Sequence, residues 1–156
     1  MDHDEAWERV RSARVARMAT VTPEHRPHVI PFVFALVERA PDLVAYWAVD
    51  RKPKRSTDLK RLRNLEQNPA VEFVVDGYDE SWERLWWVRC SGTARVVDSE
   101  PERRSALRAL AGKYPQYAIA PPEGSVVAID IETIDSWEGS GPLTTRPAPE
   151  TPTSLA

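Results

Sequence analysis

The chain contains a single cysteine, Cys90, so the sequence excludes an internal disulfide and any metal site built from several cysteines. Its three histidines, His3, His25 and His28, include no pair at the helical spacing of a metal site. The six glycines are scattered and form neither a dinucleotide-binding motif nor a phosphate-binding loop. No catalytic residue or metal ligand can be assigned from these patterns, so a cofactor would have to supply any difficult chemistry.

Long apolar runs are also absent. The longest one, residues 29–37, is far shorter than the roughly 20 residues that a membrane-spanning helix needs. The acidic, amphipathic start does not resemble a signal peptide. We therefore expect a cytoplasmic protein with no membrane partner. Free cysteine is usually buried, so we expect Cys90 to be a small core residue rather than a nucleophile.

The periodicity of apolar residues predicts three helices and six strands in one domain over residues 1–141. The helices are expected at 4–14, 57–67 and 98–112, and the strands at 15–21, 28–37, 42–49, 70–76, 84–97 and 125–139. The strands follow one another too closely for parallel crossovers, which favours a meandering or Greek-key antiparallel barrel with flanking helices. Residues 142–156 contain four prolines and no apolar period, and we expect a disordered tail.

Two strands carry residues with a special meaning. The run at 28–37 is almost wholly apolar, which predicts a strand that is buried on both faces and packs on a second subunit. Pro31 lies inside this run and indicates a sheet edge, a bulge or the close approach of a ligand. Gly92 indicates a bulge or bend in the strand at 84–97.

The main feature of the sequence is a basic segment, residues 51–63. It holds seven of the 21 basic residues and one acidic residue, although the formal net charge of the chain is −3. A helix beginning near Thr57 would turn Leu59, Leu62 and Leu65 toward the core and would place basic side chains beside its N-terminus. Basic side chains at a helix start favour a phosphate group. The alternatives are a solvated helix face and, without a second basic patch to support it, a nucleic-acid site.

Three stretches together resemble a known superfamily over residues 5–140. They read RPHVIPFVFAL, LVAYWAVDRKPKRSTDLKRLRNLEQNPAVEFVVD and LWWVRCSGTARVV. They are similar to the flavin/deazaflavin oxidoreductases, the split β-barrel relatives of pyridoxamine 5′-phosphate oxidase. The basic insertion resembles the branch that uses coenzyme F-420. The resemblance implies a six-stranded antiparallel split β-barrel of Greek-key type and a homodimer that holds its cofactor between the subunits.

The resemblance also implies positions for the cofactor. Its phosphate would meet the basic segment, with candidates Lys52, Lys54, Lys60, Arg61 and Arg63, of which Lys54, Lys60 and Arg61 are preferred. Its ring would lie along the second strand near Pro31, Phe32 and Val33. The pocket wall would be drawn from the aromatic residues Trp47, Trp86, Trp87 and Trp137, although aromatic residues in strands are more often core.

The function implied is that of an F-420-dependent oxidoreductase that passes a hydride to a small electron-poor molecule such as an enone, imine or quinone. The alternatives are an FMN-binding oxidoreductase on the same barrel, a carrier that binds the cofactor without turnover, and a nucleic-acid-binding module. Pyridoxamine-phosphate oxidases share a basic C-terminal motif, which the stretch DSWEGSGPLTTRP lacks. This difference argues against pyridoxamine phosphate as the substrate.

Overall fold

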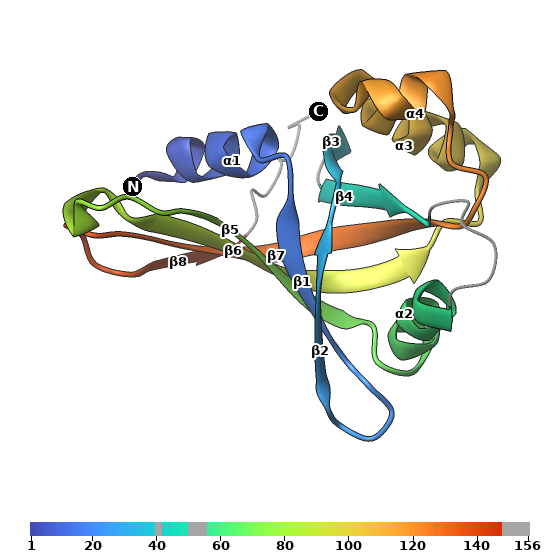
Figure 1. The fold of residues 1–156 in the computed structure, drawn as a ribbon, viewed down its shortest axis with the longest axis horizontal. Helices are drawn as coiled ribbons and strands as arrows, with labels where there is room; N and C mark the ends of the chain where they lie inside the picture. Colours follow the sequence, from blue (N-terminus) through green and yellow to red (C-terminus); the bar gives the residue numbers. More distant parts are fainter. Residues whose placement is uncertain (40–41, 50–55, 148–156) are drawn as a thin grey trace, which may run out of the picture.

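An antiparallel sheet forms the centre of the computed structural model, which describes residues 1–39, 42–49 and 56–147. Its eight strands are β1 Ala16–Val21, β2 Pro27–Phe32, β3 Ala35–Arg39, β4 Asp42–Ala48, β5 Ala70–Gly77, β6 Trp86–Val96, β7 Val126–Glu138 and β8 Thr144–Pro147. The helices are α1 His3–Ser12, α2 Ser56–Gln67, α3 Glu100–Lys113 and α4 Pro115–Ile119, with a 3₁₀ turn η1 at Trp82–Arg84. Figure 1 shows the strongly twisted sheet with the helices around it.

The order of the strands confirms an antiparallel split barrel with flanking helices. The sheet runs β2-β1-β5-β6-β7-β4-β3, and β8 pairs with β7. All pairs are antiparallel, and β2 and β3 are the ends of the path. The prediction of six strands was wrong in number, because residues 28–37 contribute to two strands and β8 follows β7.

The apolar run at 28–37 does not form one strand buried on both faces. β2 ends at Phe32, and the chain then crosses to the other end of the sheet, where β3 pairs with β4. Only alternate residues of β2 face the core, and Val29 on the opposite face is 62% exposed. Pro31 therefore lies in an edge strand, as proline's missing N–H favours.

Two layers of apolar side chains hold the fold together. The main core fills the inside of the sheet and includes Trp7 and Val10 of α1, which confirms the face predicted for this helix. A second cluster joins the other face of β4 and β7 to α3. Cys90 is fully buried, and burial raises the pKa of its thiol, so it stays neutral in the core as expected. No helix among the described residues is both long and apolar enough to span a membrane.

The bulge predicted at Gly92 is present in the pairing of β6 with β7. The register shifts between Ser91 and Gly92, and Glu132 of β7 is the residue without a partner. A Cβ atom on Gly92 would lie 2.2 Å from the carbonyl oxygen of Asp130. Glycine is therefore required by the close approach of the two backbones.

The predicted tail begins with ordered structure. Thr144–Pro147 form β8, which pairs with Thr133 to Ser136 of β7. The expectation of disorder does not hold for these four residues, because the backbone of a long strand offers hydrogen bonds that an apolar pattern does not reveal. Residues 148–156 lie outside the described part of the chain.

Candidate functional site

The described part of the basic segment lies on α2. Lys52 and Lys54 fall outside the described residues, so their predicted role is not tested. Lys60 and Arg63 are exposed, and Arg61 is half-buried. Leu62 and Leu65 of the same helix pack against the main core. The helix therefore turns Leu62 and Leu65 inward and leaves Lys60 and Arg63 at the surface, as the spacing predicts.

A buried polar contact fixes α2 against the sheet. Asn64 is only 1% exposed, and its Nδ2 donates a hydrogen bond to Oγ1 of Thr20 on β1 at 3.4 Å. Thr20 is itself buried and lies opposite His28 of β2. The contact places the basic face of α2 beside the β1–β2 hairpin, as Figure 1 shows for the two elements.

His28 is the site residue that sequence reasoning missed. Burial lowers the pKa of its imidazole, and the positive charges of Lys60 and Arg61 lower it further. Its Nδ1 is buried and has no hydrogen-bond partner among the described residues. Lys60 and Arg61 of α2 therefore lie near enough to His28 of β2 for their charges to act on its imidazole. The only signal in the sequence was the position of His28 at the start of the apolar run that was predicted to hold the cofactor ring.

This arrangement fits an anionic group such as a phosphate. Burial is the main cause of the lowered pKa of His28, and the charges of Lys60 and Arg61 add to it; an anion nearby would offset those two charges. A neutral imidazole could donate one hydrogen bond to a phosphate oxygen, and Lys60 and Arg61 could supply charge-assisted bonds.

The structure separates the three residues predicted to meet the ring. Pro31 is exposed on the outer face of β2, opposite Arg17 of β1. The side chain of Phe32 points into the core, 5.3 Å from the ring of Phe34 between centroids. Val33 is half-buried and packs against the cluster at the end of α3. Pro31 and Val33 can therefore meet a ligand, whereas the side chain of Phe32 belongs to the core.

Two of the four tryptophans predicted to line the pocket, Trp47 and Trp87, lie on different faces of the sheet. Trp47 of β4 is 2% exposed and belongs to the main core, where its ring meets Phe32 edge-on. Trp87 is half-buried near the start of β6, directly opposite Trp137 of β7. The structure does not bring Trp47 and Trp87 together, because β4 and β6 lie on either side of β7 and present them to opposite faces of the sheet.

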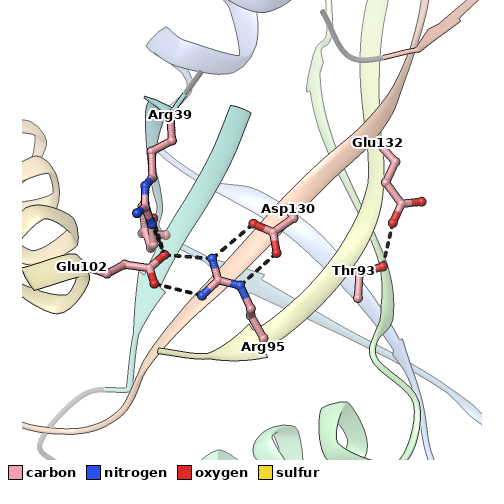
Figure 2. Close-up of polar contacts among 7 residues, drawn as sticks. Arg39, Thr93, Arg95, Glu102, Asp130 and Glu132 are labelled. Carbon is pink, nitrogen blue, oxygen red and sulfur yellow. Dashed lines mark hydrogen bonds and ion pairs between the residues drawn. The ribbon is translucent and has the colours of Figure 1, made fainter. Parts of the chain in front are cut away.

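An ion-pair network fixes α3 on the outer face of β4, β6 and β7. Figure 2 shows the guanidinium of Arg95 between the carboxylates of Glu102 and Asp130. Arg95 Nη2 donates to Glu102 Oε1 at 2.8 Å, and Arg95 Nε donates to Asp130 Oδ2 at 2.9 Å. The hydroxyl of buried Tyr46 also donates to Glu102 Oε1, at 2.7 Å. The hydrogen bonds from Arg95 are the main reason that the pKa of Glu102 is lowered to about 2.

We regard this network as structural rather than catalytic. Arg39 of β3 adds a second cation to Glu102, at 2.5 Å, so the carboxylate joins a helix to three strands, β3, β4 and β6. Every partner is a side chain of the sheet, and the carboxylate is held ionised. A firmly ionised carboxylate that is already paired is a poor proton donor or base near neutral pH.

Comparison with known proteins gives both a family and structural relatives. A family model described as pyridoxamine 5′-phosphate oxidase matches residues 3–138. A search of curated protein sequences finds no match. The fold is similar to a conserved hypothetical protein, Rv2991, from Mycobacterium tuberculosis, with 20% identity and a TM-score of 0.70 over 89% of this chain and 86% of that one.

Two further solved structures share the fold. A heme-binding protein from Mycobacterium smegmatis is 17% identical with a TM-score of 0.69, over 95% of this chain and 60% of that one. An FAD-binding protein from Mycobacterium smegmatis is 20% identical with a TM-score of 0.62, over 88% and 95% of the two chains. At these identities the likeness establishes the fold alone.

Proposed function

The chain belongs to the pyridoxamine 5′-phosphate oxidase family, and from that premise we propose that it is an oxidoreductase that uses coenzyme F-420. When bound, the reduced cofactor would supply a hydride to a small electron-poor substrate. The protein would bind the cofactor, orient it and exclude water. No side chain is assigned as a proton donor.

The observation that carries this proposal is the proximity of Lys60 and Arg61 to His28. After burial, the charges of both cations lower the pKa of the His28 imidazole on β2, so the basic face of α2 acts on this edge strand. An anionic cofactor is the occupant that such a basic face favours. F-420 carries an anionic polyglutamate tail in addition to its phosphate, and seven basic residues in the segment exceed what one phosphate needs.

A flavin is the second candidate for the cofactor. One structural relative is described as an FAD-binding protein from Mycobacterium smegmatis and another as an FAD-binding protein from Mesorhizobium loti. FMN and FAD share the phosphate chemistry of F-420 but lack the polyglutamate tail. A cofactor carrier without turnover would use the same site.

The cofactor can be identified directly. The absorbance spectrum and mass of the molecule that copurifies from a host containing both FMN and F-420 would name it, and titration with each would rank the affinities. We expect tighter binding of F-420, and clearly tighter binding of FMN or FAD would reverse the ranking. Oxidation of reduced F-420 in the presence of an enone or quinone would separate an enzyme from a carrier.

Substitutions in the basic segment test the site itself. Lys54→Ala, Lys60→Ala and Arg61→Ala should each weaken cofactor binding by roughly ten- to a hundredfold, since losing one partner of a charge-assisted hydrogen bond costs roughly 1.5–3 kcal/mol. Arg104→Ala removes an exposed arginine of α3 and serves as the matched control. Unchanged affinity in all three variants would make the segment a solvated surface, and loss of oligonucleotide binding instead would favour a nucleic-acid role.

We also propose a twofold homodimer. The outer face of β2 exposes Val29 and Pro31 at an edge of the sheet, and burial of such a face against a second copy would remove apolar area from water. Light scattering at micromolar concentration should give twice the chain mass of 17.7 kDa. A monomer mass would remove the interface between subunits that a shared cofactor site requires.

A further inference from the structure

Three segments that are distant in the sequence meet at the C-terminal end of α3. Tyr114 follows this helix, Phe34 connects β2 to β3, and Arg14 connects α1 to β1. The Tyr114 hydroxyl accepts a hydrogen bond from the N–H of Phe34 at 3.2 Å. It can donate its proton to the carbonyl oxygen of Arg14 at 2.8 Å or to that of Phe34 at 3.0 Å. The junction is thus held by hydrogen bonds that do not depend on charge.

Two cationic side chains lie on this junction. The Nζ of Lys113 is 4.2 Å from the ring centroid of Phe34 and 5.7 Å from that of Tyr114. The guanidinium of Arg14 lies 4.6 Å from the same Tyr114 ring, and its Nη1 donates to the carbonyl oxygen of Lys113 at 2.6 Å. Arg14 is exposed, whereas the Nζ of Lys113 is buried.

The junction has no carboxylate to balance this charge. Within the described residues neither Arg14 nor Lys113 forms an ion pair, and the Lys113 Nζ has no hydrogen-bond partner. Burial and the nearby charge of Arg14 lower the pKa of Lys113 to about 8. Burial of an ammonium group without a counterion costs free energy, so an anion that reached Lys113 would be stabilising.

We propose that Arg14 and Lys113 form a binding site for a small oxyanion, a carboxylate or phosphate group. The anion would meet the exposed guanidinium of Arg14 first. The unbranched Lys113 side chain would then turn its ammonium from the face of Phe34 toward it. This site is distinct from the basic segment, since it is built from the end of α3 and the α1–β1 connection.

The position of the site indicates what would carry the anion. Val33 packs against the same cluster as Tyr114 and Tyr117, at the end of the strand expected to hold the cofactor ring. An anion bound here would belong to a molecule lying beside that ring, and we assign it to the substrate. This assignment to the substrate rests on the proposed function, whereas binding of the anion does not.

The lysine content of the chain provides a sharp test. There are four lysines, Lys52, Lys54, Lys60 and Lys113, and three of them lie in the basic segment. In the full-length protein labelled with ¹³C-lysine, the Cε signal of Lys113 can be assigned from its loss in Lys113→Met. Sodium phosphate and sodium benzoate are then titrated separately at constant ionic strength. The Lys113 signal should move saturably with at least one probe, and the pKa of Lys113 should rise above its value without the anion.

Variants of Arg14 decide the result. Arg14→Gln should weaken binding of the anion about tenfold, and Arg14→Lys should restore part of it. Arg108→Gln replaces an exposed arginine of the same helix as Lys113 and should leave the affinity for the anion unchanged. Saturation by benzoate alone or by phosphate alone would name the anion as carboxylate or phosphate.

Two results would overturn the proposal. A Lys113 signal that does not saturate with either probe would show that the aromatic rings alone stabilise the ammonium. Binding of the anion by Arg14→Gln as tightly as by the wild type would also overturn the proposal. The cofactor site is tested separately. If F-420 leaves the signals of Lys52, Lys54 and Lys60 unmoved, this result contradicts the proposed function but does not affect the Arg14–Lys113 site.

Discussion

Replacing Glu102 with glutamine should destabilise the protein in a way that depends on pH. The Glu102 carboxylate is 8% exposed and is held by Arg95, Tyr46 and Arg39, which together keep its pKa at about 2 against an ordinary value of 4.5. The difference of about 2.5 pH units corresponds to about 3 kcal/mol at roughly 1.4 kcal/mol per unit. Arg95 and Arg39 are 40% and 48% exposed, so solvent screening reduces this to about 1–3 kcal/mol.

The sign follows from the lowered pKa. Below pH 4.5 the unfolded chain takes up a proton at Glu102 before the folded protein does, so the stabilisation is complete above about pH 4.5 and is lost as the pH falls through about 2. Urea unfolding of the wild type and Glu102→Gln should therefore differ most at neutral pH, and the difference should close near pH 2. Glutamine has nearly the same shape, so the comparison isolates the charge.

Glu132 provides the matched control, since it is an exposed carboxylate that accepts a hydrogen bond from the neutral hydroxyl of Thr93 at 2.6 Å (Figure 2). Glu132→Gln should change the free energy of unfolding by less than about 0.5 kcal/mol at every pH. Equal stability of Glu102→Gln and the wild type at pH 7 would refute the reasoning, as would a difference that stays constant down to pH 2.

Three further predictions concern other parts of the fold. Gly92→Ala should destabilise the protein by about 1–3 kcal/mol in urea unfolding, because the Cβ of the new alanine would clash with the carbonyl oxygen of Asp130. An unchanged urea midpoint would mean that the bulge can shift. A chain ending at Pro147 should unfold at the same temperature as the full chain, whereas one ending at Gly141 should be less stable because it lacks β8. Relative to Lys113→Met, the wild type should gain stability as the pH increases from about 8 to 10.5, since the unfolded chain holds the Lys113 proton longer than the folded protein does.

Local patterns predicted the parts of the fold that depend on near neighbours. The spacing of Trp7 and Val10 predicted the buried face of α1, and Gly92 predicted an irregularity at its position, which is a bulge in the pairing of β6 with β7. The run at 28–37 was misread because it contains no period that shows where one strand stops. Its division at Phe32 follows from pairing partners, β1 for one half and β4 for the other, that are distant in the sequence.

The sequence predicted the positive charge of the candidate site, but it did not predict all of the residues that form the site. The excess of basic residues in the segment could be counted, and the leucine spacing of α2 showed that these residues face outward. The contribution of His28 could not be predicted, because it depends on the packing of α2 against β1 and β2. The roles of Phe32 and Trp47 were equally open, since an aromatic residue in a strand suits a core and a pocket wall alike.

The sequence by itself determined that the chain folds around an antiparallel sheet with flanking helices and that a third of its positive charge lies in one short segment. The tertiary structure decided which charges meet. Arg95 joins Glu102 to Asp130, while Arg14 and Lys113 come together with no acidic partner among the described residues. The physical reason is that hydrophobic periodicity acts over a few residues, whereas the pKa of a group depends on every charge within several ångströms, whatever its place in the chain.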